Sequence, residues 1–128
     1  MNFAIGDRSA TGSRQGTYNT WPTRFKATEI RNASMTWVFN DEHPDSINDG
    51  FECPPTTEGE SNVWSDVPAS YHNGACGFAF ADGHSEIHHW MDASTMHPVV
   101  KNETWLPLTV SAPKNDITWV FMRLSPAY

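Results

Sequence analysis

Residues 75–90, ACGFAFADGHSEIHHW, constrain the fold more than any other part of the sequence. Two segments with alternating apolar residues flank Asp82-Gly83. Asp-Gly is a preferred two-residue hairpin turn, because both turn positions adopt positive φ. The segment therefore predicts an antiparallel hairpin with strands at about 75–81 and 84–90.

A two-residue turn also predicts the pairing, with Ala81 opposite His84 and Phe78 opposite Ile87. Alternate side chains of a strand share a face. The face predicted to lie on the core carries Cys76, Phe78, Phe80 and Ile87. The face predicted to be open carries His84, Glu86 and His88 across from Gly77, Ala79 and Ala81.

The pattern His84-x-Glu86-x-His88 offers ligands that zinc, iron or copper accept. Residues two apart on a strand lie about 6.5–7 Å apart, so one ion needs a further ligand from another segment, such as His72. The competing interpretation is that these side chains are the solvated face of an edge hairpin. The sequence leaves both open.

The chain of 128 residues predicts one domain over 1–128, with residues 1–22 as a loop-like lead-in. Aromatic residues make up 12% and there are nine Pro and eight Gly, which predicts a small aromatic core, short strands and long turns. A strand is expected at 34–40, a helical turn at 23–30, and either a strand or a short helix at 116–124. The predicted class is mainly β with an α+β remnant, a small antiparallel sheet with long loops.

A long acidic loop, DEHPDSINDGFECPPTTEGESN, follows the strand at 34–40. Loops of this length are usually functional or tied down. Its carboxylate and amide oxygens are the ligands that calcium prefers, although their spacing does not match the helix-loop-helix calcium pattern. The candidate calcium ligands are Asp41, Glu42, Asp45, Asn48 and Asp49.

The formal net charge of −7 makes nucleic acid a poor partner, because phosphate would be repelled. Cys53 and Cys76 form one disulfide in an oxidising compartment or stay free in a reducing one. No long apolar run and no basic-then-apolar leader occurs, so we expect no membrane anchor and no export signal in this chain.

The sequence contains no serine-hydrolase elbow, phosphate-binding glycine loop or dinucleotide fingerprint. Two functions remain open on the residues alone. One is a metal-dependent hydrolase of esters or lactones that uses His84, Glu86 and His88 with His72 or His89. The other is a carbohydrate- or surface-binding module that uses Trp64, Trp90 and Trp105.

His72, nine further residues and Asp82-Gly83 resemble the C-terminal signature of a bacterial group of prepilin-like proteins with a His-x9-Asp-Gly domain, abundant in planctomycetes and verrucomicrobia. Two further stretches are similar to that group: TWVFNDEHPDSINDGFE, and NDITWVFMRLSP near the end. The resemblance covers about residues 23–125. The prepilin cleavage site and apolar N-terminal helix are not part of the sequence.

The resemblance implies a pseudopilin-like fold, in which an antiparallel sheet packs on a long N-terminal helix. It implies a non-enzymatic subunit of type II secretion or pilus-like filaments, located in the cell envelope or secreted. Some pseudopilins bind calcium in a loop near the sheet, in agreement with the acidic loop here. Without the helix one sheet face is uncovered, so we expect self-association as a homodimer or through filament-type contacts.

Overall fold

The computed structural model describes residues 2, 5, 26–48, 50–52, 63–101 and 108–124. Within these ranges the fold is mainly β, as predicted, with antiparallel sheets, one short α-helix and long loops. One sheet has three strands in the order β1-β3-β4, and a second has two strands, β2 and β5. The strands are β1 (Trp37–Asn40), β2 (Val63–Trp64), β3 (Ala75–Phe80), β4 (Ser85–His89) and β5 (Leu108–Thr109).

The short 3-10 helix η2 (Ala27–Glu29) agrees with the helical turn expected at 23–30. A second 3-10 helix, η3 (Ala33–Met35), occupies the start of the strand predicted at 34–40, so β1 begins later than predicted. The segment at 116–124, open to two interpretations in the sequence, begins with the α-helix α1 (Asn115–Phe121). Its buried apolar residues Ile117, Val120 and Leu124 recur at helical spacing and face the core. No helix in the described ranges has the length and apolarity needed to cross a bilayer.

The core is rich in aromatic rings, as predicted. Phe78 of β3 lies edge-on to three tryptophans, with ring centroids 6.0 Å from Trp37, 6.0 Å from Trp90 and 5.0 Å from Trp119. The indole of Trp90 donates to the carbonyl of Ala69 at 2.7 Å. Large rings of this kind supply much buried area at few positions, which suits a small core.

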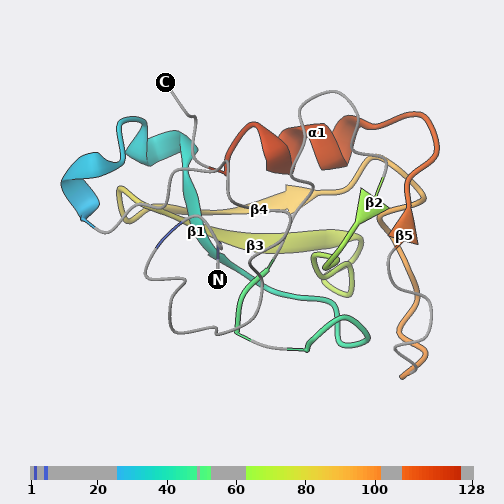
Figure 1. Ribbon diagram of the computed structural model, residues 1–128. Coiled ribbons are helices and arrows are strands. Elements are labelled where there is room, and N and C mark those ends of the chain that lie inside the picture. The colour runs from blue at the N-terminus through green and yellow to red at the C-terminus, as the bar shows by residue number, and fades with distance from the viewer. Residues whose placement is uncertain are drawn as a thin grey trace, which may run out of the picture.

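Figure 1 shows α1 lying over β4 and the small β2-β5 sheet at the end of the hairpin opposite its turn. Two buried aspartates attach the helix to the strand. Asp116 accepts the backbone N–H groups of Met91 at 3.0 Å and Asp92 at 2.9 Å. In return, Asp92 accepts the N–H of Asp116 at 3.0 Å and the side chain of Asn115 at 2.9 Å. The start of α1 is therefore fixed to the chain leaving β4.

The hairpin is present at the predicted place, but the predicted register is wrong by one residue. Ala75 pairs with His89, and Phe78 with Glu86. The turn has three residues, 81–83. The carbonyl of Phe80 accepts the N–H of Gly83 at 3.0 Å, and its N–H donates to the carbonyl of His84 at 2.9 Å. Gly83 has φ +94°, the conformation of the third residue in a three-residue hairpin loop.

A shift of one residue exchanges the faces of β4, because side chains alternate along a strand. Cys76, Phe78 and Phe80 are buried as predicted, but the prediction that Ile87 joins them is wrong, since Ile87 is 68% exposed. His84, Glu86 and His88 pair with the core-facing residues of β3 instead of with Gly77, Ala79 and Ala81. The side chain of Asp82 accepts the N–H of His84 at 3.1 Å and thereby helps to close the turn.

Candidate functional site

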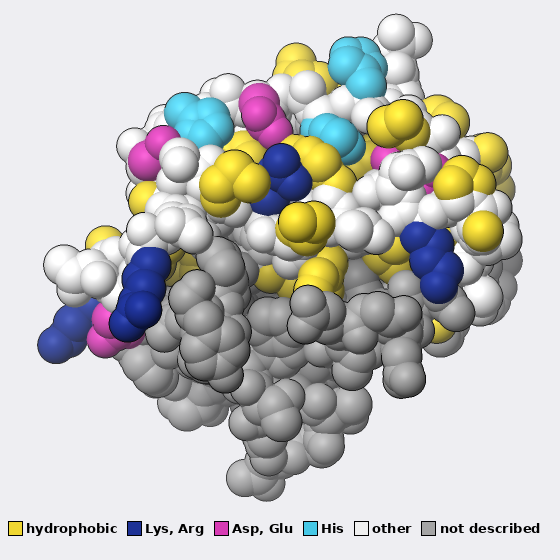
Figure 2. Space-filling model, turned by 90° about the horizontal axis from the view of Figure 1, so that it is seen from above, with side chains coloured by type: hydrophobic (Ala, Val, Ile, Leu, Met, Phe, Trp, Pro, Cys, Tyr) yellow, Lys and Arg dark blue, Asp and Glu magenta, His cyan; other side chains and the backbone are white. Residues whose placement is uncertain are grey.

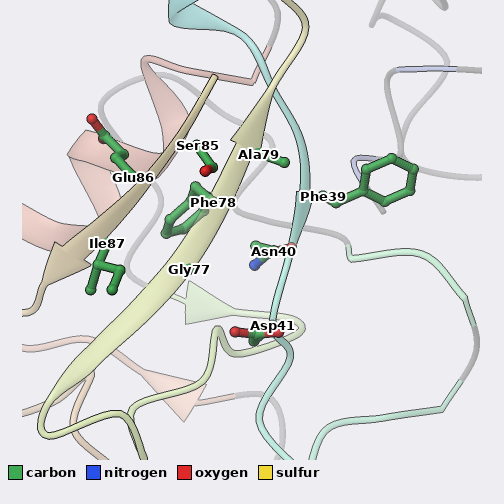
Figure 3. Close-up of a pocket in the computed structure, with 9 residues that line it drawn as sticks. All are labelled: Phe39, Asn40, Asp41, Gly77, Phe78, Ala79, Ser85, Glu86 and Ile87. Atoms are coloured by element: carbon green, nitrogen blue, oxygen red, sulfur yellow. The ribbon is translucent and has the colours of Figure 1, made fainter. Parts of the chain in front are cut away.

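The open face of the three-stranded sheet carries a shallow groove of about 550 Å³. Small residues form its floor, where Ala79 of β3 pairs with Ser85 of β4. On its other side, Ala79 pairs with Phe39 of β1. Phe39 is 55% exposed and Ile87 is 68% exposed, so large apolar side chains lie on both sides of the groove. Figure 3 shows the residues that line it: Phe39, Asn40, Asp41, Gly77, Phe78, Ala79, Ser85, Glu86 and Ile87.

Gly77 keeps the groove open next to Asp41. A Cβ atom at position 77 would lie 3.2 Å from Oδ2 of Asp41, which is a tighter contact than most Cβ atoms make. The same oxygen lies 3.2 Å from Nε2 of His72. A side chain at position 77 would therefore require the Asp41 carboxylate to shift by a few tenths of an ångström.

His72 and Asp41 form an exposed pair at this end of the groove, and each side chain is 49% exposed. The ring of Tyr71 lies 4.6 Å from the ring of His72, and partial burial, assisted by the charge of Asp41, raises the pKa of Tyr71. Cys76 lies close by but is buried, and its Sγ donates to the carbonyl of Asp41 at 3.3 Å. Burial raises the pKa of Cys76 far above its ordinary value, so the thiol is not activated as a nucleophile.

The predicted transition-metal set is not brought together. The ring of His84 stacks on Phe80 with centroids 4.3 Å apart, and Nδ1 of His84 lies 2.5 Å from Oδ1 of Asp82. The ring of His88 stacks on Trp119 with centroids 3.8 Å apart. His72 pairs with Asp41 at the far end of β3 from the turn. Each ring is thus held by a neighbour of its own.

The position of His88 between two tryptophans affects its protonation. Its ring also lies 4.9 Å from Trp90, and its Nε2 is buried with no hydrogen-bond partner. Burial lowers the pKa of His88, because the charged form loses hydration. Arg123, stacked over Trp119 with Cζ 4.1 Å from the ring centroid, covers the other side of the stack.

The described part of the acidic loop, residues 41–48 and 50–52, is tied down by its own side chains, as one of the two interpretations of its length predicted. Oδ2 of buried Asp45 accepts the N–H of Val100 at 2.6 Å. His43 is fully buried; its Nδ1 accepts the N–H of Asp45 at 3.1 Å, so its Nε2 donates to the carbonyl of His97 at 3.0 Å. The loop is therefore packed against the segment that follows β4.

The predicted calcium ligands have separate partners in this arrangement. Asp41 pairs with His72, Glu42 accepts the hydroxyl of Ser46 at 3.0 Å, and Asn48 donates to Asp66 at 3.4 Å. Asp49 lies outside the described residues. Across the described ranges, no three His, Cys, Asp or Glu side chains are grouped so that they would hold a metal ion. The calcium and zinc assignments stay predictions.

Glu52 is a buried carboxyl group that the sequence analysis missed. It is 0% exposed, its Oε2 accepts the side-chain amide of Asn40, and its Oε1 has no hydrogen-bond partner. Burial raises the pKa of Glu52 well above its usual range, and the charges of Glu42 and Asp66 raise it further. The only sequence signal is its position between Phe51 and Cys53. The pairing of Asp41 with His72 was also missed, because the two lie far apart in the chain.

Two of the three tryptophans proposed for glycan binding, Trp64 and Trp90, are core residues. Trp64 is 0% exposed and Trp90 is 6% exposed, so neither ring is free to stack on a sugar. Trp105 and Cys53 lie outside the described residues, while Cys76 is a free thiol. Comparison with protein-family models, with curated protein sequences and with solved structures found no match to this chain.

Proposed function

We propose that this chain is a non-enzymatic, pseudopilin-like assembly domain of the cell envelope or of a secreted filament, and that its open sheet face packs on an apolar α-helix. The observation that carries the proposal is the groove on that face. Small residues form its floor and the exposed Phe39 and Ile87 flank it. A helix needs a surface of this kind, because small residues let its side chains approach the sheet closely.

Two features of the sequence give further support. The His72-x9-Asp82-Gly83 signature encloses β3, the central strand of the sheet that carries the groove. The segments that resemble the prepilin-like group also contain β1 and α1, which complete the sheet and its cover. Self-association, as a homodimer or through filament-type contacts, is part of this proposal.

Ala79→Arg is the sharpest test, because Ala79 lies at the centre of the groove and its side chain points away from the core. In the source cells, antibodies against the domain should detect the wild-type protein in envelope fractions and on sheared surface filaments. The Ala79→Arg protein should accumulate to the same level without assembling. Wild-type protein found only in the soluble cell interior would overturn the proposal.

Ala27→Arg on η2 is the matched control, since it makes the same substitution at an exposed position away from the groove and should assemble normally. Equal assembly of Ala79→Arg and the control would also contradict the use of this face. Both variants should give the circular dichroism spectrum of the wild type.

The hydrolase alternative requires His84, Glu86 and His88 to leave their present neighbours and surround one ion. Elemental analysis of protein purified without added metal, with His84→Ala and His88→Ala as comparisons, tests zinc and calcium together. Bound zinc lost in both variants, together with ester or lactone hydrolysis lost in both, would replace the proposed function by that alternative.

A further inference from the structure

The outer edge of β4 is open, unlike the outer edge of β1. On β1, the carbonyl of Val38 accepts the N–H of Asn2 at 2.9 Å, and the N–H of Trp37 donates to the carbonyl of Arg123 at 3.0 Å. β4 is the other edge strand of the sheet. Among the described residues, no group is hydrogen-bonded to its outer side. An edge of this kind is ready to accept another strand.

The register identifies the backbone groups that point outward from β4. The hydrogen bonds between Phe80 and His84, and from Trp90 to Gly74, show that the even-numbered residues of β4 bond to β3. The N–H and C=O groups of Ser85, Ile87 and His89 therefore point away from the sheet. All three residues are exposed, and Ile87 is 68% exposed.

The geometry points to a homodimer in which two β4 edges pair antiparallel about a twofold axis at Ile87, forming one continuous six-stranded sheet. Ile87 then faces Ile87 of the second copy, and Ser85 faces His89. Each of these pairs exchanges two backbone hydrogen bonds, about six in total. The inference rests on the β4 edge; it specifies the homodimer named in the proposed function, but it does not depend on the groove or on the packing of a helix there.

Strand overlap and charge favour this register among the antiparallel alternatives, because the axis at Ile87 pairs all five residues of β4 with the second copy. With the axis at Ile87, Glu86 lies opposite His88 of the second copy, so its carboxylate faces no like charge. Moving the axis to Glu86 would place two carboxylates opposite each other, and moving it to His88 would pair two imidazoles. Centring the axis on Ser85 would also place Glu86 opposite a histidine, His84, but it would set Ile87–His89 beside the turn of the second copy and shorten the pairing.

The surroundings of the edge suit a second copy. Figure 2 shows histidine, acidic and basic side chains gathered among hydrophobic ones on the face that carries α1 and β4. Met91, which is 72% exposed, lies two residues beyond the end of β4. The strand is short and the contact smaller than a standard interface, so we expect a dissociation constant on the order of 10 μM.

Ile87→Pro tests the edge without breaking the hairpin, because the N–H that proline lacks points outward and is not bonded to β3. In sedimentation equilibrium from about 1 to about 500 μM, the wild type should show a monomer–dimer equilibrium. Ile87→Pro should weaken it at least tenfold, while Ile87→Val, which keeps the N–H, should retain it. A wild type that stays monomeric throughout, or a folded Ile87→Pro that dimerises like the wild type, would overturn the inference.

Cysteine cross-linking tests the register and does not depend on the proline variant folding. Residues facing each other in a hydrogen-bonded pair have Cα atoms about 5.5 Å apart, within disulfide reach. In a Cys53→Ser background, Ile87→Cys should therefore form a disulfide-linked dimer on mild oxidation. Ser85→Cys should not, since the two positions 85 would lie about 13 Å apart.

The double variant Ser85→Cys/His89→Cys should regain the cross-link, because residue 85 faces residue 89. Cys76 is buried and stays out of the reaction. Cross-linking of Ser85→Cys as fast as Ile87→Cys, or failure of both Ile87→Cys and the double variant, would contradict the twofold at Ile87.

Discussion

Glu52 is the residue whose environment fits its ordinary charge least well. It is fully buried, and only one of its two oxygens accepts a hydrogen bond, from Asn40. An unpaired buried carboxylate is costly, so the native state favours the protonated form and raises the pKa of Glu52. The folded protein therefore holds a proton that the unfolded chain releases.

The pH dependence of stability follows from this difference. Between the unfolded pKa near 4.5 and the raised folded value, the native state binds more protons than the unfolded state. The free energy of unfolding contributed by Glu52 therefore falls as pH rises through that window. Glu52→Gln removes the charge but keeps an oxygen for Asn40, so we expect a gain of about 1–3 kcal/mol at pH 8, measured by urea denaturation from pH 4 to 8.

Glu29→Gln is the matched control for the change in net charge. The pH profile of unfolding should keep its wild-type slope in this variant and become flatter in Glu52→Gln. A Glu52→Gln protein that is less stable than the wild type at pH 8 would show that the carboxylate is compensated in the native state.

The sequence shows which polar side chains are present, but the groups that these side chains contact are harder to predict. The sequence identified His72, Asp41, His84 and His88 as polar groups of interest, yet their partners are set by folding. His72 contacts Asp41, and His88 stacks on Trp119 of α1. The burial of Glu52 was not predicted, because a position between Phe51 and Cys53 is only a weak indication that a carboxyl group is buried.

At the scale of elements, the hairpin depends on the glycine that closes its turn. Gly83 has φ +94°, and nothing lies within 4 Å of a Cβ built there, so backbone strain alone opposes a side chain. Gly83→Ala should destabilise the protein by about 1–2 kcal/mol in thermal or urea unfolding. Gly50→Ala, which also has open space and no positive φ, should change stability by less than about 0.5 kcal/mol. Equal effects at both positions would contradict this account.

The attachment of α1 to the chain after β4 depends on Asp116. Its carboxylate accepts two backbone N–H groups, which Asp116→Ala would leave without a partner in a buried place. We expect a loss of about 2–4 kcal/mol, with a smaller loss for Asp116→Asn, which keeps one oxygen. Thr118→Ala, at an exposed position of the same helix, is the control. Urea denaturation followed by tryptophan fluorescence measures all three, and a neutral Asp116→Ala would refute this role.

The elements themselves were largely predictable, and their register was not. Alternation of apolar residues indicated the hairpin, and β-branched and aromatic residues indicated β1. Asp82-Gly83 fits both a two-residue turn and the end of a three-residue turn, because both place a glycine at positive φ. Local sequence did not separate the two. In the observed register Ile87 is exposed, and the ring of His88 is stacked on Trp119 of α1.

For the whole molecule, Cys76 offers a probe of global opening. It is a free, fully buried thiol on the central strand of the sheet, and burial raises its pKa. In a Cys53→Ser background, a thiol reagent should label it only as fast as the sheet opens. We expect labelling at least 100-fold slower than in urea-unfolded protein, and faster in Asp116→Ala. Labelling of native protein at the unfolded rate would show that β3 is locally exposed.

The number of residues in the hairpin turn decides which side chains of β4 face the solvent. Removing one residue between Phe80 and His84 would leave every strand residue in place along the chain, yet it would send Ile87 inward and turn His84, Glu86 and His88 outward. Composition, charge and hydrophobic content would hardly change. Among proteins built on this hairpin, a single insertion or deletion at the turn would therefore be enough to exchange one set of contacts for another, without any substitution on the strands.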